Sequence, residues 1–304
     1  MKHRAGYAAI IGLPNSGKST LLNCFLGQKL SIVSHKPQTT RRRIAGILSE
    51  PEYQVVFLDT PGILNPEYLL QKTMLEWVRF AIADADVMLL LLDAKEDPGG
   101  EKLFANDFLA AELPKLNTPV VLVVNKIDLI EQSKAADILQ KFSSSDKFRH
   151  VIPVSALHGF NKDTLLEAIL GFFPEHPKYY EEDIVSDEME RFFVTEIIRE
   201  KIFELYEDEI PYSSEVEIEE FKEREGPKDY IRAAINIERA SQKGIIIGNK
   251  GDAIKKLGLA ARKAIEEFHG KEVFLELYVR VAEKWRTNER MIRKFGYNLP
   301  ESDD

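Results

Sequence analysis

Residues 12–19 read Gly-Leu-Pro-Asn-Ser-Gly-Lys-Ser, the pattern of a phosphate-binding loop. The apolar run 8–11 comes before them, and a helical-looking stretch follows. In that setting, backbone N–H groups and the start of the helix face the phosphates. We expect Lys18 to reach the β- and γ-phosphate oxygens and Ser19 to ligate Mg²⁺. The sequence therefore predicts a nucleotide-binding α/β domain at the start of the chain.

The rest of the loop and the first helical turn are also expected to contact the nucleotide. Glycine at 12 and 17 lets the backbone turn tightly enough to form the cradle. The further contact residues are Asn15, Ser16, Gly17 and Thr20.

Up to about residue 173, short apolar runs alternate with amphipathic stretches. This alternation is typical of a mostly parallel sheet with helices on both faces. The motifs below fall at or just after the carboxyl ends of strands, where open α/β sheets bind ligands. Strands are expected at 8–12, 44–49, 54–59, 87–93, 120–125 and 151–155, and helices from near residues 18, 69, 101, 134 and 163.

The motif Asp-Thr-Pro-Gly at 59–62 supplies the second part of the site. Asp59 is expected to hold Mg²⁺, usually through water, and the Gly62 amide to bond the γ-phosphate. Because that bond requires a triphosphate, the segment from 60 to about 80 is a candidate switch.

A threonine in the polar segment 37–43 should complete the Mg²⁺ shell and sense the γ-phosphate. We assign Thr40, which directly precedes an arginine, and Thr39 is the alternative. Lys18, Thr40 and Gly62 are thus the residues expected to act in hydrolysis.

The motif Asn-Lys-Ile-Asp at 125–128 follows another apolar run. The Asp128 carboxylate can accept hydrogen bonds from N1–H and the 2-amino group of guanine, a donor pair that adenine lacks. Lys126 can lay its stem along the base, and Asn125 can tie this loop to the phosphate loop. These residues predict guanine rather than adenine and disfavour a P-loop kinase.

After the next apolar run comes Ser155-Ala156-Leu157. The Ala156 amide would face guanine O6. Four motifs in this order, each at a sheet end, predict a GTP-binding domain.

Two residues depart from the Ras-like pattern and bear on mechanism. Ile63 stands where Ras-like enzymes carry the glutamine that orients water, and Pro14 obstructs entry of an arginine finger. Asn15 resembles an asparagine that coordinates potassium in related GTPases, so K⁺-stimulated hydrolysis is our hypothesis.

A second domain follows a linker. We predict a GTPase domain over 1–175, a linker over 176–186 and an RNA-binding domain with a basic tail over 187–304. Gly248-Asn249-Lys250-Gly251 matches the Gly-x-x-Gly loop of KH domains, which clamps about four single-stranded nucleotides. The order of elements around it is helix, strand, strand, helix, loop, helix, strand.

The RNA surface should combine this loop with nearby cations and apolar side chains. Aromatic and cationic residues of the tail could stack on bases, or they could pack a terminal helix. The expected RNA contacts are Lys243, Ile245, Ile246, Ile247, Gly248, Asn249, Lys250 and Gly251, with the strand residues Ile231, Ala233, Ile235 and Ile237 completing the groove.

Composition narrows the class of protein. A net charge of −9 over 304 residues argues against an indiscriminate nucleic-acid binder, although cations prevail around 243–263 and 280–294. The single cysteine, Cys24, fits a reducing cytoplasm. The start of the chain leaves no room for a signal peptide, and the longest apolar run, 87–92, is too short to span a bilayer.

With both halves in view, the chain closely resembles the Era family of bacterial ribosome-assembly GTPases, within the TrmE-Era-EngA-like superfamily. The resemblance rests on the phosphate loop, residues 38–41, 59–62, 125–128 and 155–157, and the Gly-x-x-Gly loop. It implies a P-loop GTPase domain followed by a smaller α+β type II KH domain.

The resemblance also implies partners. These are GTP or GDP with Mg²⁺, the 3′ end of small-subunit ribosomal RNA, and the maturing small subunit. The family implies a monomer in the cytoplasm, with peripheral contact at the inner membrane.

Other functions remain open at this point. The chain could be a tandem-type or tRNA-modifying GTPase of the same superfamily, but it carries neither a second GTPase domain nor a modification domain. It could act on another RNA, or use GTP mainly as a structural ligand.

Overall fold

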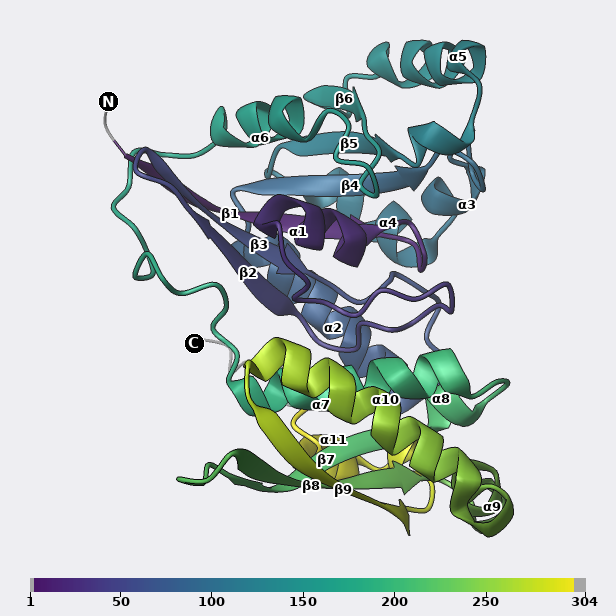
Figure 1. The fold of residues 1–304 in the computed structure, drawn as a ribbon. Coiled ribbons are helices and arrows are strands. Elements are labelled where there is room, and N and C mark those ends of the chain that lie inside the picture. Colours follow the sequence, from purple (N-terminus) through teal and green to yellow (C-terminus); the bar gives the residue numbers. More distant parts are fainter. Residues whose placement is uncertain (1–2, 298–304) are drawn as a thin grey trace. The chain divides into compact units, whose positions relative to one another are not determined.

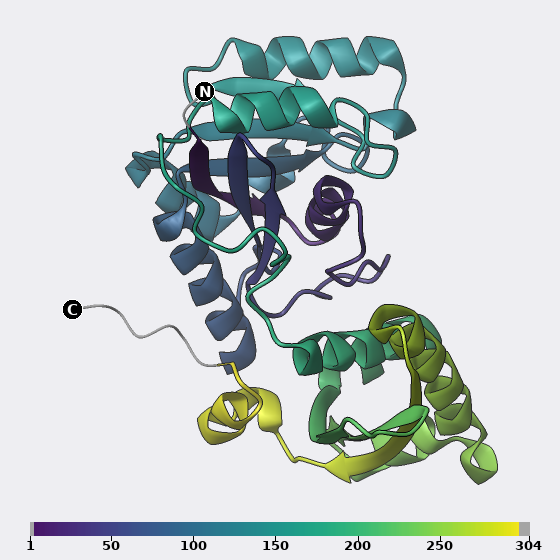
Figure 2. The same cartoon turned by 60° about the vertical axis from the view of Figure 1, so that its left-hand side comes forward.

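The computed structural model describes residues 3–297 and divides them into two compact units. The first contains 3–187 apart from 68–70, and the second contains 188–297 together with 68–70. Each unit has its own sheet (Figures 1 and 2). Each also has its own clusters of buried apolar residues. No helix within residues 3–297 is long and apolar enough to cross a membrane.

A six-stranded sheet forms the centre of the first unit, in the order β2-β3-β1-β4-β5-β6. Neighbouring strands are parallel except β2 and β3, which form an antiparallel hairpin. The predicted mostly parallel sheet is confirmed. Its antiparallel strand is β2, which lies at one edge. The strands are β1 (Arg4–Gly12), β2 (Ile44–Ser49), β3 (Tyr53–Asp59), β4 (Val87–Asp93), β5 (Val120–Asn125) and β6 (His150–Pro153).

Helices cover both faces of this sheet (Figure 1). Side chains of α1 and α6 pack on one face, and those of α2 to α5 pack on the other. Because both faces are covered, β4 and β5 are apolar along almost their whole length. The helices are α1 (Lys18–Leu26), α2 (Leu69–Asp84), α3 (Glu101–Phe104), α4 (Asp107–Glu112), α5 (Gln132–Ser143) and α6 (Lys162–Leu170), with 3₁₀ turns η1 (Leu113–Lys115) and η2 (Ile127–Leu129).

The segment after α6 is bonded to the β2–β3 hairpin. The fully buried Gln54 accepts the N–H groups of Tyr179 and Tyr180, at 2.7 and 3.1 Å, and donates to the Tyr180 carbonyl. Ile47 N–H donates to the Val185 carbonyl at 2.8 Å. Residues 179–186, which the sequence places in the linker, therefore lie against the first unit. We call this segment the strap.

The second unit has a three-stranded sheet in the order β7-β8-β9. Strands β7 and β8 are antiparallel, whereas β8 and β9 are parallel. With the helices, this gives the predicted α+β KH order. The elements are α7 (Glu190–Leu205), α8 (Ile210–Ser213), β7 (Glu215–Lys222), β8 (Lys228–Ile237), α9 (Ala240–Ile247), η3 (Asn249–Gly251), α10 (Asp252–His269), β9 (Glu272–Val281), η4 (Trp285–Thr287) and α11 (Glu289–Lys294).

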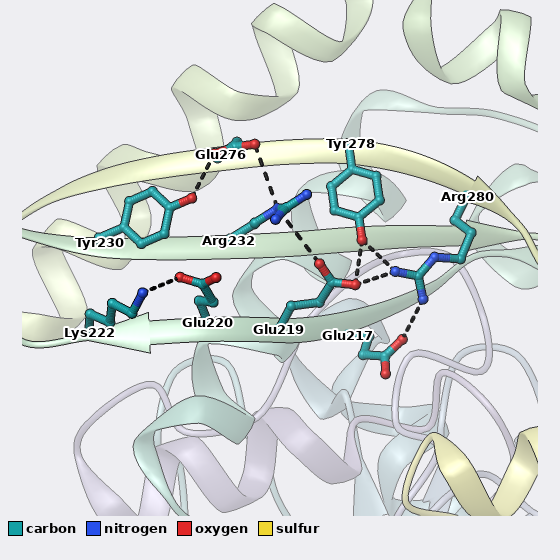
Figure 3. Close-up of polar contacts among 9 residues, drawn as sticks. All are labelled: Glu217, Glu219, Glu220, Lys222, Tyr230, Arg232, Glu276, Tyr278 and Arg280. Atoms are coloured by element: carbon teal, nitrogen blue, oxygen red, sulfur yellow. Dashed lines mark hydrogen bonds and ion pairs between the residues drawn. The ribbon is translucent and has the colours of Figure 1, made fainter.

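The two faces of this sheet differ in chemistry. One face packs its apolar residues against α7, α9 and α10. The other carries a ladder of acidic, basic and tyrosine side chains (Figure 3). In that ladder, Tyr230 donates to Glu276 at 2.7 Å, and Arg280 pairs with Glu217 at 3.2 Å.

Candidate functional site

The phosphate loop joins β1 to α1, as its sequence predicts, and glycine is required at two of its positions. Gly17 caps α1 with φ +97°, and a Cβ there would lie 2.2 Å from the side-chain nitrogen of Asn125. A Cβ on Gly12 would lie 2.7 Å from Ser16 Oγ. The loop is therefore closely packed as well as tightly turned. Thr20 is half-buried in the first turn of α1.

Lys18 is buried at the base of the loop. Its ammonium donates to the carbonyls of Gly12 and Leu13, at 3.1 and 2.9 Å. Burial lowers the pKa of Lys18 to about 8, and repulsion from Lys126 acts in the same direction against the attraction of Asp59. A phosphate oxygen could replace these carbonyls as the partner of the ammonium.

Three oxygen-bearing side chains come together beside Lys18. Ser19 Oγ donates to Asp59 Oδ2 at 2.7 Å and lies 3.0 Å from the Thr40 hydroxyl. Burial raises the pKa of Asp59, and its Oδ1 has no hydrogen-bond partner within the described residues. Hydroxyl and carboxylate oxygens are the ligands that Mg²⁺ prefers. The cluster fits a magnesium ion, and it favours Thr40 over Thr39 as the threonine ligand.

The loop after β3 approaches the phosphate loop closely. A Cβ on Gly62 would lie 2.7 Å from the backbone nitrogen of Pro14, so only glycine fits there. Ile63 is fully buried and donates its N–H to the Gly12 carbonyl at 3.1 Å. Its side chain therefore belongs to the core, and water for hydrolysis must be oriented by other groups.

Asn125 connects the loops expected to bind the base. Its Nδ2 donates to the Ser16 carbonyl at 2.8 Å, and its Oδ1 accepts the Ala156 N–H at 3.0 Å. Ser155 is buried beside it, whereas the Leu157 side chain is exposed. One amide thus fixes the distance between the phosphate end and the base end of the site.

Lys126 and Asp128 lie on the same loop, just past Asn125. The Lys126 ammonium donates to Asp93 Oδ2 at 2.6 Å, at the carboxyl end of β4. Asp128 Oδ2 lies 3.8 Å from His158 Nε2. Asp93 was not foreseen from the sequence. The available signal was its place at the end of a strand, next to the strand that ends at Asn125.

The Gly-x-x-Gly turn of the second unit separates α9 from α10. Gly248, Lys250 and Gly251 have φ values of +74°, +51° and +85°. Asn249 and Lys250 are exposed at the tip. Glycines therefore make the turn, and a polar and a cationic side chain are left for a ligand.

Two sequence predictions for this RNA surface are wrong. Ile246 is fully buried in the core, because neighbouring positions of a helix face different directions; Ile245 is 53 % exposed, and Ile247 is half-buried. Lys243 is exposed, as expected. The strand residues expected in the groove belong to the central strand and are fully buried: Ile231, Ala233, Ile235 and Ile237.

The sequence predicts that strand residues of β8 line the RNA-binding groove. In the structure β8 is the central strand and β9 is an edge strand. Leu277 is partly buried and lies 3.8 Å from the position of a Cβ on Gly258. An apolar side chain next to α10 at this edge of the sheet thus comes from β9.

Comparison with known proteins identifies the family. A model described as "50S ribosome-binding GTPase" matches residues 7–126, and a KH-domain model matches 209–286. GTPase Era of Geotalea uraniireducens is 47 % identical over 97 % of this chain and 98 % of its own length. The chain belongs to the Era family of GTPases.

Solved structures agree with this assignment. A crystal structure of Era in complex with MgGDPNP and nucleotides 1506–1542 of 16S ribosomal RNA has a TM-score of 0.91. It is 38 % identical and covers 98 % of this chain and 100 % of that one. An Aquifex aeolicus Era variant bound to GDP and aluminium tetrafluoride has a TM-score of 0.90 at 37 % identity, with the same coverage. A chloroplastic GTPase ERA1 of Zea mays is 47 % identical over 97 % of this chain and 71 % of its own length.

The C-terminal aromatics of this Era-family chain pack a terminal segment instead of stacking on bases. Trp285 is fully buried and donates to the Ser213 carbonyl at 2.8 Å. Phe295 is buried edge-on against Trp285. The Tyr297 hydroxyl donates to the buried Glu215 at 2.5 Å. Of the two predictions for the tail, the packed helix is confirmed for its aromatic residues.

Proposed function

We propose that this chain is a GTP-driven switch that binds the 3′ end of small-subunit ribosomal RNA and assists maturation of the small subunit. The observation that carries the proposal is the likeness over 98 % of the chain to an Era bound to both MgGDPNP and 16S RNA. The local geometry supports each half of it.

In the first unit, Ser19, Thr40 and Asp59 would hold Mg²⁺, and Lys18 and the Gly62 amide would bond the γ-phosphate. The magnesium ion would neutralise charge that develops on the phosphates during transfer. Asn125, Lys126, Asp128 and the 155–157 loop would bind guanine. Hydrolysis removes the contact at Gly62 and releases the loops.

The strap after α6 gives this switch a route towards the RNA-binding unit. Ser186 donates its hydroxyl to the Ala45 carbonyl at 2.7 Å, and Val185 accepts from Ile47. Both contacts are made to β2, which starts four residues after Thr40. Movement of Thr40 with the γ-phosphate would therefore act on the residues that lead into α7.

A potassium ion beside the phosphates is part of the proposal. Asn15 has φ +63° and donates to the His35 carbonyl at 2.9 Å, which ties the phosphate loop to the segment before Thr40. A cation held by Asn15 Oδ1 would add positive charge next to the phosphates. Equal hydrolysis rates in sodium and potassium chloride would contradict this part.

We also propose that the chain works as a monomer in the cytoplasm. Peripheral contact with the inner membrane rests on the family resemblance alone. Sedimentation with anionic vesicles, with and without the RNA, is the measurement that tests it.

The RNA-binding proposal is tested at the tip of the Gly-x-x-Gly turn. A Gly248→Asp change would place a Cβ 2.3 Å from Asp252 Oδ1 and disturb the turn itself. Lys250→Gln removes one exposed charge and leaves the backbone alone. Lys222→Gln is the matched control. The Lys222 ammonium pairs with Glu220 at 2.7 Å among the polar side chains on the sheet (Figure 3), not at the Gly-x-x-Gly turn.

Fluorescence anisotropy with an RNA of the 16S 3′ end measures the outcome. Lys250→Gln should weaken binding about five- to tenfold and reduce the salt dependence by about one charge. The Lys222→Gln control should bind like the unaltered protein. Equal RNA affinities of the unaltered protein, Lys250→Gln and Lys222→Gln would contradict RNA binding at the turn.

A further inference from the structure

An ion pair occupies the base end of the nucleotide site. The Lys126 ammonium lies 2.6 Å from Asp93 Oδ2, and the two side chains are 28 % and 11 % exposed. Partial burial makes such a pair stronger and less sensitive to salt than one at the surface. Lys126 is the residue whose stem is expected to lie along the guanine ring.

Asp93 is itself fixed on both sides. Its Oδ1 accepts the N–H groups of Lys95 and Glu96, at 3.0 and 3.1 Å. Its backbone pairs with Asn125 across β4 and β5, and Ala94 N–H donates to the Asn125 carbonyl at 2.9 Å. One carboxylate oxygen closes the turn after β4, and the other faces Lys126. The carboxylate therefore has little freedom to follow the lysine.

Lys126 needs such a partner because its side chain is long and flexible. Its backbone is in the left-handed region, at φ +63°, which fixes where the side chain starts but not where it ends. The counter-charge at Asp93, 2.6 Å away, holds the Lys126 ammonium at one place.

We propose that Asp93 is a positioning residue that holds Lys126 across the base site, so that its stem forms a ready wall for the guanine ring. Without this partner the lysine side chain would become ordered only when the nucleotide binds. The entropy lost at that step would make nucleotide binding weaker. The proposal rests on the assignment of the guanine site.

Consequences for binding follow from this role. GDP and GTP are affected equally, because Asp93 acts at the base end. The preference for guanine over xanthine is unchanged, because Asp128 sets it. Most of the change lies in the dissociation rate, since a loosened wall releases the base sooner.

The principal variant is Asp93→Asn, which keeps an oxygen for the Lys95 and Glu96 N–H groups but removes the charge facing Lys126. Asp97→Asn is the matched control. Asp97 is a buried aspartate four residues on, and it accepts the N–H groups of Lys102 and Leu103. Asp93→Glu keeps the charge and tests rescue.

Stopped-flow fluorescence with a labelled GDP and a labelled GTP analogue gives the rates and affinities. We expect Asp93→Asn to weaken both about tenfold, Asp93→Glu to recover most of the loss, and Asp97→Asn to match the unaltered protein. An unchanged affinity in Asp93→Asn would overturn the proposal.

A double-mutant cycle with Lys126→Met separates positioning from a structural effect. Methionine keeps most of the stem and loses the ammonium. If Asp93 acts through Lys126, adding Asp93→Asn to Lys126→Met causes no further loss. A second tenfold loss would overturn the proposal. Failure of the unaltered protein to bind GDP would instead contradict the guanine site itself.

Discussion

Lys18 combines a buried position with a charge that phosphate binding requires. Burial lowers its pKa to about 8, so part of the population is neutral above that pH. A polyphosphate favours the protonated amine and raises the pKa again. Nucleotide binding above about pH 8 must therefore take up a proton at Lys18.

We predict that GDP affinity changes little from pH 6.5 to 7.5 and weakens as the pH rises through 8 towards 9. The limit for one group is about tenfold per pH unit. Calorimetry in two buffers of different ionisation enthalpy counts the protons. Uptake approaching one proton at pH 9 is expected. No uptake at pH 9 would show that Lys18 is fully charged before binding.

At the scale of elements, α9 places two adjacent isoleucines in different environments. Ile246 is fully buried among α7, α10 and the sheet, while Ile245 is 53 % exposed next to the Gly-x-x-Gly turn. The same chemical change should therefore affect mainly stability at Ile246 and mainly RNA binding at Ile245.

Ile246→Ala should lower the free energy of unfolding by about 2–5 kcal/mol, as large-to-small changes in cores do. Ile245→Ala should cost less than about 0.5 kcal/mol but weaken RNA binding severalfold. Chemical denaturation and RNA titration of both variants provide the check. Our assignment of Ile246 to the core and Ile245 to the RNA surface would be contradicted if only Ile246→Ala weakened RNA binding and did so without a loss of stability.

A second element-level feature joins the ends of α7, β8 and α10. His269 contacts Glu190 through Nδ1 and Asp229 through Nε2, the latter at 2.8 Å, and Lys271 donates to Asp229 at 2.6 Å. Hydrogen bonding to Asp229, then the contacts with Glu190, raise the pKa of His269. Hydrogen bonds from Lys271 and His269 hold the pKa of Asp229 well below its usual range.

The sign of the pH dependence follows from these directions. The raised pKa of His269 stabilises the fold fully below about pH 6.5, its unfolded value, and this contribution disappears as the pH rises through the folded value. The lowered pKa of Asp229 stabilises the fold above about pH 4 and is lost in acid. We predict that His269→Gln lowers Tm at pH 6 more than at pH 9. Equal shifts at both pH values would exclude a charged His269.

Much of the fold follows from local pattern. The strands at 44–49, 87–93 and 120–125 match the sequence prediction residue for residue, because each is a short run rich in apolar residues that polar residues follow. The four motifs proposed to bind the nucleotide could be located for a similar reason, since each of them lies at or just after the end of a strand, whereas Thr40 lies in a polar segment before β2.

What could not be predicted depends on contacts between distant residues. The burial of Trp285 involves Ser213, 72 positions away, and the strap is held through Gln54, 125 positions before Tyr179. An apolar run such as 245–247 does not show which of its residues faces the core until the neighbouring elements are placed. Which of β8 and β9 is the edge strand likewise depends on the sheet order.

At the scale of the whole molecule, one chain carries the proposed nucleotide site and the Gly-x-x-Gly turn in two separate units. The strap residues bonded to β2 link the Thr40 segment to the start of the second unit through continuous chain. A γ-phosphate that draws in Thr40 and Gly62 would favour one state of the strap, and RNA binding should respond.

The most direct test measures affinity for an RNA of the 16S 3′ end with saturating GDP and with a saturating non-hydrolysable GTP analogue, both with Mg²⁺. Coupling between sites of this kind typically changes affinity by about 5- to 150-fold. We predict at least fivefold tighter RNA binding in the GTP-analogue state. Equal affinities in the two states would contradict a nucleotide-driven switch.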